Sequence, residues 1–127
     1  MEKQISIAKL FNLYEKTKQT VEDMEDDYRD LIRTKNKEQR ISVGVLLGMF
    51  NYDGKYYKEF KRTLSKDMVK RLEKVVTNEL YESLTDKEET RVVKAALPVF
   101  RKMLKHYREK LKSLSKFIRN ATIQFPF

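Results

Sequence analysis

The segment from residue 85 to residue 119 reads TDKEETRVVKAALPVFRKMLKHYREKLKSLSKFIR. Thr85 and Glu88 form a capping box, in which each side chain can accept a hydrogen bond from a backbone N–H at the start of a helix. Beyond it, apolar residues recur alternately four and three positions apart: Val93, Leu97, Phe100, Leu104, Tyr107, Leu111, Leu114 and Ile118. This spacing predicts an amphipathic helix over about 86–119. Pro98 removes one helical hydrogen bond, and we expect it to kink this helix rather than end it.

The N-terminal part of the chain carries the same period. Apolar residues, with Thr17 as the one polar member, recur three and four apart: Ile7, Leu10, Tyr14, Thr17, Val21, Met24, Tyr28 and Leu31. They predict a second long helix over about 6–34. Two stripes of similar length are most simply explained by packing against each other or against copies in a dimer. We therefore expect an all-α fold, an elongated bundle of four or five helices that forms a single domain over residues 1–127.

Two shorter segments between the long helices also carry helical signals. Ser65 can cap a helix of about 66–83, whose apolar residues follow helical spacing. Residues 56–64 are expected to form a short helix that leads into it.

The segment 41–60 fits two patterns. Its apolar residues alternate as in a strand, and Asp53-Gly54 is a hairpin-type turn signal. The same residues also fit a helical stripe, which the helical neighbours favour, so both alternatives remain open. Gly44 and Gly48, four residues apart, would let another backbone approach closely and are candidate partner-binding residues.

The chain ends in an apolar tail. Pro126 cannot continue a helix, so we expect residues 120–127 to be extended. Ile123, Phe125 and Phe127 would be costly to leave in water. Phe125 and Phe127 are therefore further candidates for contact with a partner.

Composition restricts the possible chemistry. There is no cysteine and His106 is the only histidine, so we expect no metal site, no cofactor and no catalytic nucleophile–base pair. No apolar run is long enough to span a bilayer, and we expect a cytoplasmic protein. The net charge is +9, and it is unevenly distributed. Residues 1–30 hold five basic and eight acidic residues, whereas residues 91–127 hold ten basic residues and one acid, Glu109.

A row of cations lies opposite the apolar stripe of the predicted last helix. Its members recur at three- and four-residue intervals on one helix face: Arg101, Lys105, Arg108, Lys112, Lys116 and Arg119. The row spans about 27 Å at 1.5 Å per residue, a length comparable with several phosphates of a nucleic-acid strand. Tyr107 faces the predicted core, so no aromatic platform for stacked bases accompanies the row. We expect it to hold a phosphate backbone without reading sequence.

A second basic group lies in the middle of the chain. It includes Lys55, Lys58 and Arg62, and it lies beside Tyr52, Tyr56 and Tyr57. Bases could stack on these tyrosines. The simpler interpretation, which we favour, is that the three tyrosines are half-buried core residues.

Two short stretches resemble known families. Arg101-Lys-Met-Leu-Lys-His106 resembles the R-x4-H motif of HEPN ribonucleases, but positions five apart on a helix point about 140° from each other. A shared pocket would therefore need a distorted helix or a second subunit. Val21–Tyr28 and Leu84–Glu89 resemble landmarks of the helical domain of GINS replication-complex subunits, although the chain has no room for the small β-domain of that family.

The leading hypothesis is a non-enzymatic subunit that binds the backbone of DNA or RNA through its last helix. The alternative is a protein–protein interaction or assembly module, such as a helical adaptor, an inhibitor, a homo-oligomer or a subunit of a larger complex. Its partner would be an acidic protein surface or a second copy. The acidic first half of the chain could also neutralise the basic row internally. Association with a membrane surface would need a free apolar face, and the seam of the last helix is expected to be committed to the core.

Overall fold

The computed structural model describes residues 6–77 and 84–124, with backbone alone for residues 75–77 and 121–124. Over these ranges the chain forms five helices and no strand: α1 (Ile7–Lys35), α2 (Val43–Gly48), α3 (Gly54–Thr63), α4 (Lys66–Thr77) and α5 (Asp86–Gln124). The predicted all-α fold with two long helices is confirmed.

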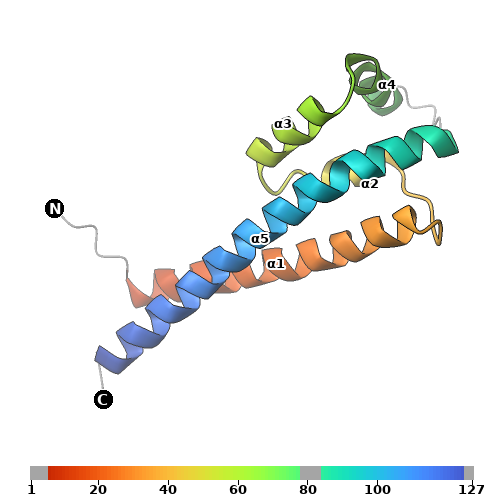
Figure 1. Cartoon of the computed structure of the whole chain (residues 1–127). Coiled ribbons are helices and arrows are strands. Elements are labelled where there is room, and N and C mark those ends of the chain that lie inside the picture. Colours follow the sequence, from red (N-terminus) through yellow and green to blue (C-terminus); the bar gives the residue numbers. More distant parts are fainter. Residues whose placement is uncertain (1–5, 78–83, 125–127) are drawn as a thin grey trace.

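The two long helices run antiparallel and cross (Figure 1). Every predicted seam position of α1 except Ile7 is buried or half-buried, and so is every seam position of α5. α2, α3 and α4 lie beside the end of the pair where α1 ends and α5 begins (Figure 1). Of the described helices, only α1 and α5 form the opposite end.

The first half of α5 buries a wider face than the predicted seam. Four further apolar residues on it are buried: Val92, Ala96, Val99 and Met103. The reason is that this part of α5 packs against α3 as well as α1. Phe50, in the turn after α2, stacks on Phe60 of α3 at 4.5 Å between ring centroids and meets Phe100 of α5 edge-on at 5.8 Å. All three rings are fully buried, and each contributes about 1.5–3 kcal/mol by leaving water.

The ambiguous segment 41–60 is helical. The Ser42 hydroxyl caps α2 by accepting from the Val45 N–H at 3.2 Å, and the Asp53 carboxylate caps α3 by accepting from the Lys55 N–H at 3.0 Å. Asp53-Gly54 therefore starts a helix instead of turning a hairpin. A Cβ added at Gly44 or Gly48 would meet nothing within 4 Å, so no backbone in the described part of the chain approaches them closely.

The ends of two helices differ from expectation. α4 begins at the predicted cap, since the Ser65 hydroxyl accepts from the Met68 N–H at 3.2 Å. It extends to Thr77, and the rest of its predicted range lies outside the described residues. α5 passes through Pro98 and continues to Gln124, so residues 120–124 of the expected extended tail are helical. Residues 120–124 contain no proline or glycine, and a proline restricts mainly the residue directly before it. Phe125 and Phe127 lie outside the described residues.

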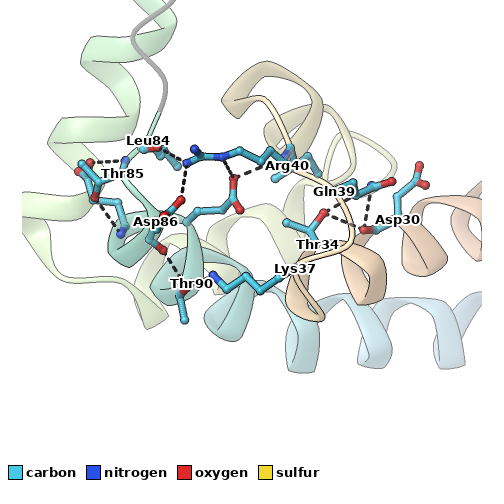
Figure 2. Close-up of polar contacts among 12 residues, drawn as sticks. Asp30, Thr34, Lys37, Gln39, Arg40, Leu84, Thr85, Asp86 and Thr90 are labelled. Carbon is cyan, nitrogen blue, oxygen red and sulfur yellow. Dashed lines mark hydrogen bonds and ion pairs between the residues drawn. The ribbon is translucent and has the colours of Figure 1, made fainter.

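A polar network ties the turn after α1 to the start of α5 (Figure 2). Arg40 donates to the carbonyl oxygen of Leu84 at 2.7 Å and forms ion pairs with Asp86 at 3.0 Å and Glu89 at 3.4 Å. Glu89 is only 4% exposed. Its Oε2 also lies 3.5 Å from the Ile41 N–H, which donates to it. A buried carboxylate is thus neutralised by a residue 49 positions away in the chain. No sequence pattern predicts this pairing.

Candidate nucleic-acid interface

The six cations of the predicted row form one stripe on α5. At 100° per residue their directions fall within about 80° of one another around the helix axis. All six side chains are exposed: Arg101, Lys105, Arg108, Lys112, Lys116 and Arg119. We call this set the basic stripe. A rigid helix of 39 residues carries it, so the spacing of its charges is fixed.

The basic stripe is neutralised only in part by α1. Arg101 Nε donates to the Tyr28 hydroxyl at 3.1 Å, and Arg108 Nε forms an ion pair with Glu25 at 3.3 Å. Within the described ranges, the other four members make no hydrogen bond or ion pair: Lys105, Lys112, Lys116 and Arg119. The internal neutralisation that the acidic half of α1 could supply is therefore confined to the inner part of the stripe.

Lys94 continues the stripe toward the start of α5. It is exposed and precedes Arg101 by seven residues, which is almost two full turns. With Lys94 included, the row is about 37 Å long at 1.5 Å per residue.

The second basic group does not join the stripe. Lys55, Lys58 and Arg62 are exposed on α3. On α5, the residues that face α3 are Lys102, which pairs with Glu59 at 2.9 Å, and His106, whose ring lies 6.2 Å from that of Tyr56. These two positions lie about 80–120° around the axis from the middle of the stripe. The two groups therefore face in different directions.

The tyrosines beside the second group are buried or make contacts within the protein. Tyr56 is buried. The Tyr52 hydroxyl donates to Asp27 Oδ2 at 2.7 Å. Tyr57 is half-buried, and the Lys61 ammonium lies 4.4 Å from its ring centroid. The interpretation of these tyrosines as core residues holds, and they form no open platform for bases.

Arg101 and His106 do not form a common pocket. Arg101 reaches Tyr28 of α1, whereas His106 lies exposed beside Tyr56 of α3 and Tyr107. The two side chains point to different neighbouring helices, as their separation of five residues predicts. The R-x4-H pattern thus has no matching geometry within one chain.

The acidic face of α1 has perturbed electrostatics at one position. Burial raises the pKa of Asp27, the hydrogen bond from Tyr52 lowers it, and the nearby charges of Asp30, Asp23 and Asp26 raise it further. Among the residues that the structure describes, no group of three or more histidine or acidic side chains could hold a metal ion. The described helices also include none that is long and apolar enough to cross a bilayer.

A cleft of about 420 Å³ lies where α3 and α4 meet α5, and the sequence pattern did not reveal it. Its lining is mainly apolar and includes the two cationic residues Arg91 and Lys94. Pro98 also lines it. Because Pro98 has no N–H, the carbonyl of Lys94 lacks its usual helical donor. The only signal in the sequence was a proline inside a helical pattern.

Comparison with protein families, with curated proteins and with solved structures gives no match to this chain. Its function is therefore argued from its own residues, of which the basic stripe is the most extensive charged feature on one helix face.

Proposed function

We propose that this protein binds the phosphate backbone of DNA or RNA through α5, without reading base sequence and without catalysing a reaction. The observation that carries the proposal is a row of exposed cations without partners among the described residues: Lys105, Lys112, Lys116 and Arg119. From Lys105 to Arg119 the row spans about 21 Å at 1.5 Å per residue.

Such a row suits phosphate contacts. Each contact releases condensed counterions from the nucleic acid, and this release favours binding at low salt. The stripe contains no aromatic or amide side chain that could stack on a base or bond to its edge. Phosphate contacts by themselves position a duplex or a single strand and carry no direct sequence information.

The outer half of the stripe is the expected centre of binding. Glu25 lies 3.3 Å from Arg108, so a phosphate there would meet a neutralised cation and a nearby carboxylate. Lys112, Lys116 and Arg119 lie beyond this pair, toward the end of α5. On α1, the acidic residues concentrate between Glu22 and Asp30, and residues 7–20 hold three lysines and one acid.

A matched pair of variants tests the proposal. Lys112→Gln/Lys116→Gln removes two exposed cations four residues apart on α5, and Lys66→Gln/Lys70→Gln removes two exposed cations four apart on α4. Fluorescence anisotropy with labelled DNA and RNA should show weaker binding for the first variant. Its plot of log affinity against log salt should be less steep by about one for each lost contact. The α4 variant should bind like the wild type. Equal binding by both variants would show that α5 is not the site.

An assembly module is the second candidate, and one observation favours it. Val45 on α2 is a large exposed apolar side chain, and the open positions Gly44 and Gly48 lie on the same short helix. A second copy or a partner protein could approach this surface closely. Sedimentation equilibrium of the wild type and of Gly48→Leu tests this candidate. A wild-type oligomer that the substitution dissociates would support it, and a wild-type monomer would remove self-assembly from consideration.

A further inference from the structure

Exposed apolar side chains gather at one end of the molecule. Of the five large hydrophobic residues that are exposed in the described ranges, four lie where α1 begins or α5 approaches its end: Ile7, Phe11, Leu13 and Phe117. Phe117 is 67% exposed. The fifth, Val45, is on α2, which lies nearer the other end (Figure 1).

The exposure follows from the packing. At the covered end, α2, α3 and α4 pack beside the long pair, and α5 buries residues on two sides. At the other end, no described helix other than α1 and α5 lies beside the pair (Figure 1). Leu111, Leu114 and Ile118 of the seam are half-buried there, whereas Val93, Leu97 and Phe100 at the covered end are buried. A two-helix contact covers a single seam, so apolar residues on either flank remain in water.

The same end is positively charged. Residues 7–20 hold three lysines and one glutamate, and residues 109–120 hold three lysines, one arginine and one glutamate. The next part of α1, residues 21–35, holds six acids and three bases. Positive charge and exposed apolar surface therefore coincide only at this end of the long pair.

A second copy of the chain does not suit this surface. Contact between two such ends would bring net positive charge against net positive charge. The acidic part of α1 has the complementary charge, but none of the exposed large hydrophobic residues lies within it. Burial of the four side chains needs a partner surface that is both negatively charged and apolar.

We infer that the open end of the α1–α5 pair docks on an anionic lipid bilayer. Ile7, Phe11 and Leu13 lie within about 9 Å of the start of α1, and Phe117 lies about 10 Å from the last described residue of α5, at 1.5 Å per residue. Interfacial apolar groups enter a bilayer by about 5–10 Å. An end-on approach that carries the described ends of α1 and α5 to this depth reaches all four residues, whichever side of the pair they face. Lys9 and Arg119 lie within the same depth, and their long side chains extend toward the headgroups. Lys16, Lys18 and Lys112 then lie at the level of the headgroups, where anionic lipids attract cations.

Vesicle binding tests the inference with a matched control. Large unilamellar vesicles of phosphatidylcholine with about 30 mol% phosphatidylserine supply the negative surface, and vesicles of pure phosphatidylcholine serve as the neutral reference. The wild type should co-sediment with the anionic vesicles only. Phe11→Gln/Phe117→Gln should weaken this binding at least tenfold. Val45→Gln removes the exposed apolar side chain distant from the open end and should leave binding unchanged.

A fluorescent probe tests insertion directly. The chain has no tryptophan, so Phe117→Trp and Val45→Trp each introduce a single one at an exposed position. With anionic vesicles, the emission of the Phe117→Trp variant should shift to shorter wavelength and be quenched by lipids brominated in their acyl chains. The emission of the Val45→Trp variant should not change.

Three results would overturn the inference: no binding to anionic vesicles, binding that survives Phe11→Gln/Phe117→Gln, or a wild-type dimer that Phe117→Gln dissociates. The outcome is separable from that of the nucleic-acid proposal. Phe11→Gln/Phe117→Gln keeps every cation of the basic stripe and should retain nucleic-acid binding. A protein that binds vesicles and no nucleic acid would therefore contradict the proposed function alone.

Discussion

The Tyr52 hydroxyl donates a hydrogen bond to Oδ2 of Asp27 over 2.7 Å, and this bond joins the turn before α3 to the acidic stretch of α1. Both groups are half-buried. Burial raises the pKa of Tyr52 well above its ordinary value near 10, and the hydrogen bond and negative charge of Asp27 raise it further. The two partners of this contact therefore make stability depend on pH in two ranges, Tyr52 at alkaline pH and Asp27 at acid pH.

At alkaline pH we expect the protein to lose stability through Tyr52. Its pKa is higher in the folded state than in the unfolded chain, so its contribution is fully present below about pH 10 and is lost as pH rises toward the folded-state pKa. Chemical denaturation between about pH 8 and 11 should show this loss in the wild type and a smaller loss in Tyr52→Phe. Tyr14→Phe removes a half-buried hydroxyl that has no hydrogen-bond partner among the described residues, and it should follow the wild type.

At neutral pH, Asp27→Asn should be at least as stable as the wild type. The raised pKa of Asp27 means that the folded state disfavours its charge, and an asparagine Oδ1 can still accept from Tyr52. The folded wild type binds a proton at Asp27 more tightly than the unfolded chain does. The free energy of unfolding of the wild type therefore rises relative to that of the variant as pH falls toward about 4. Denaturation at the two pH values measures the difference. An advantage of the variant that grows on acidification would contradict the account.

The capping box at the start of α5 should contribute measurably to the free energy of unfolding. The Thr85 N–H donates to Glu88 Oε1 at 3.0 Å, and the Glu88 N–H donates to the Thr85 hydroxyl at 3.2 Å. Thr85→Ala should lower the free energy of unfolding by about 0.5–2 kcal/mol. Thr20→Ala makes the same change inside α1, where the hydroxyl bonds only to the carbonyl of Lys16, and should cost less.

The Thr85 N–H also holds the pKa of Glu88 below its usual range, with help from Arg71 and the Thr85 hydroxyl. A lowered folded-state pKa contributes stability above the unfolded-state value near 4.3 and loses it as pH falls through the folded-state pKa. Glu88→Gln should therefore be less stable than the wild type at neutral pH, with a gap that narrows on acidification. A gap of equal size at acid pH would mean that Glu88 acts through packing alone.

Loss of the ion pair between Arg40 and the buried Glu89 should lower the free energy of unfolding. Among the described residues, Arg40→Ala leaves the Glu89 carboxylate with the Ile41 N–H at 3.5 Å as its remaining donor. A buried group deprived of its partner costs about 1–3 kcal/mol, which thermal or chemical denaturation resolves. Arg91→Ala removes an exposed arginine with no ion pair to a described residue and should have little effect. Equal stability of Arg40→Ala and the wild type would show that Glu89 finds another partner.

Much of the helical framework was predictable because local signals agree with one another. The 3–4 spacing of both seams, the Ser65 cap and the Thr85–Glu88 box each predicted what is observed. Segment 41–60 stayed ambiguous because, over so few residues, periods of 2 and 3.6 select overlapping positions. The side chains of Ser42 and Asp53 accept hydrogen bonds from backbone N–H groups at the starts of α2 and α3, and these caps favour the helical conformation.

The arrangement of the candidate site depended on tertiary structure. The cations of α5 were visible in the sequence, but the pairing of Arg108 with Glu25 depends on the antiparallel register of α1 and α5. Likewise, a continuous seam such as Leu111 to Ile118 does not indicate whether further helices cover its flanks. That is decided by where α2, α3 and α4 pack, and they lie at the other end (Figure 1).

The most direct test of the central claim is the salt dependence of nucleic-acid binding by the wild-type protein. Anisotropy titrations with two duplexes of unrelated sequence, from about 50 to 200 mM salt, give the slope of log affinity against log salt. Four phosphate contacts, by Lys105, Lys112, Lys116 and Arg119, predict a slope near −3.6 on duplex DNA, or about a hundredfold loss over this range, with equal affinity for both sequences. No binding at the lowest salt, or affinity that does not change with salt, would contradict a phosphate-binding role for α5.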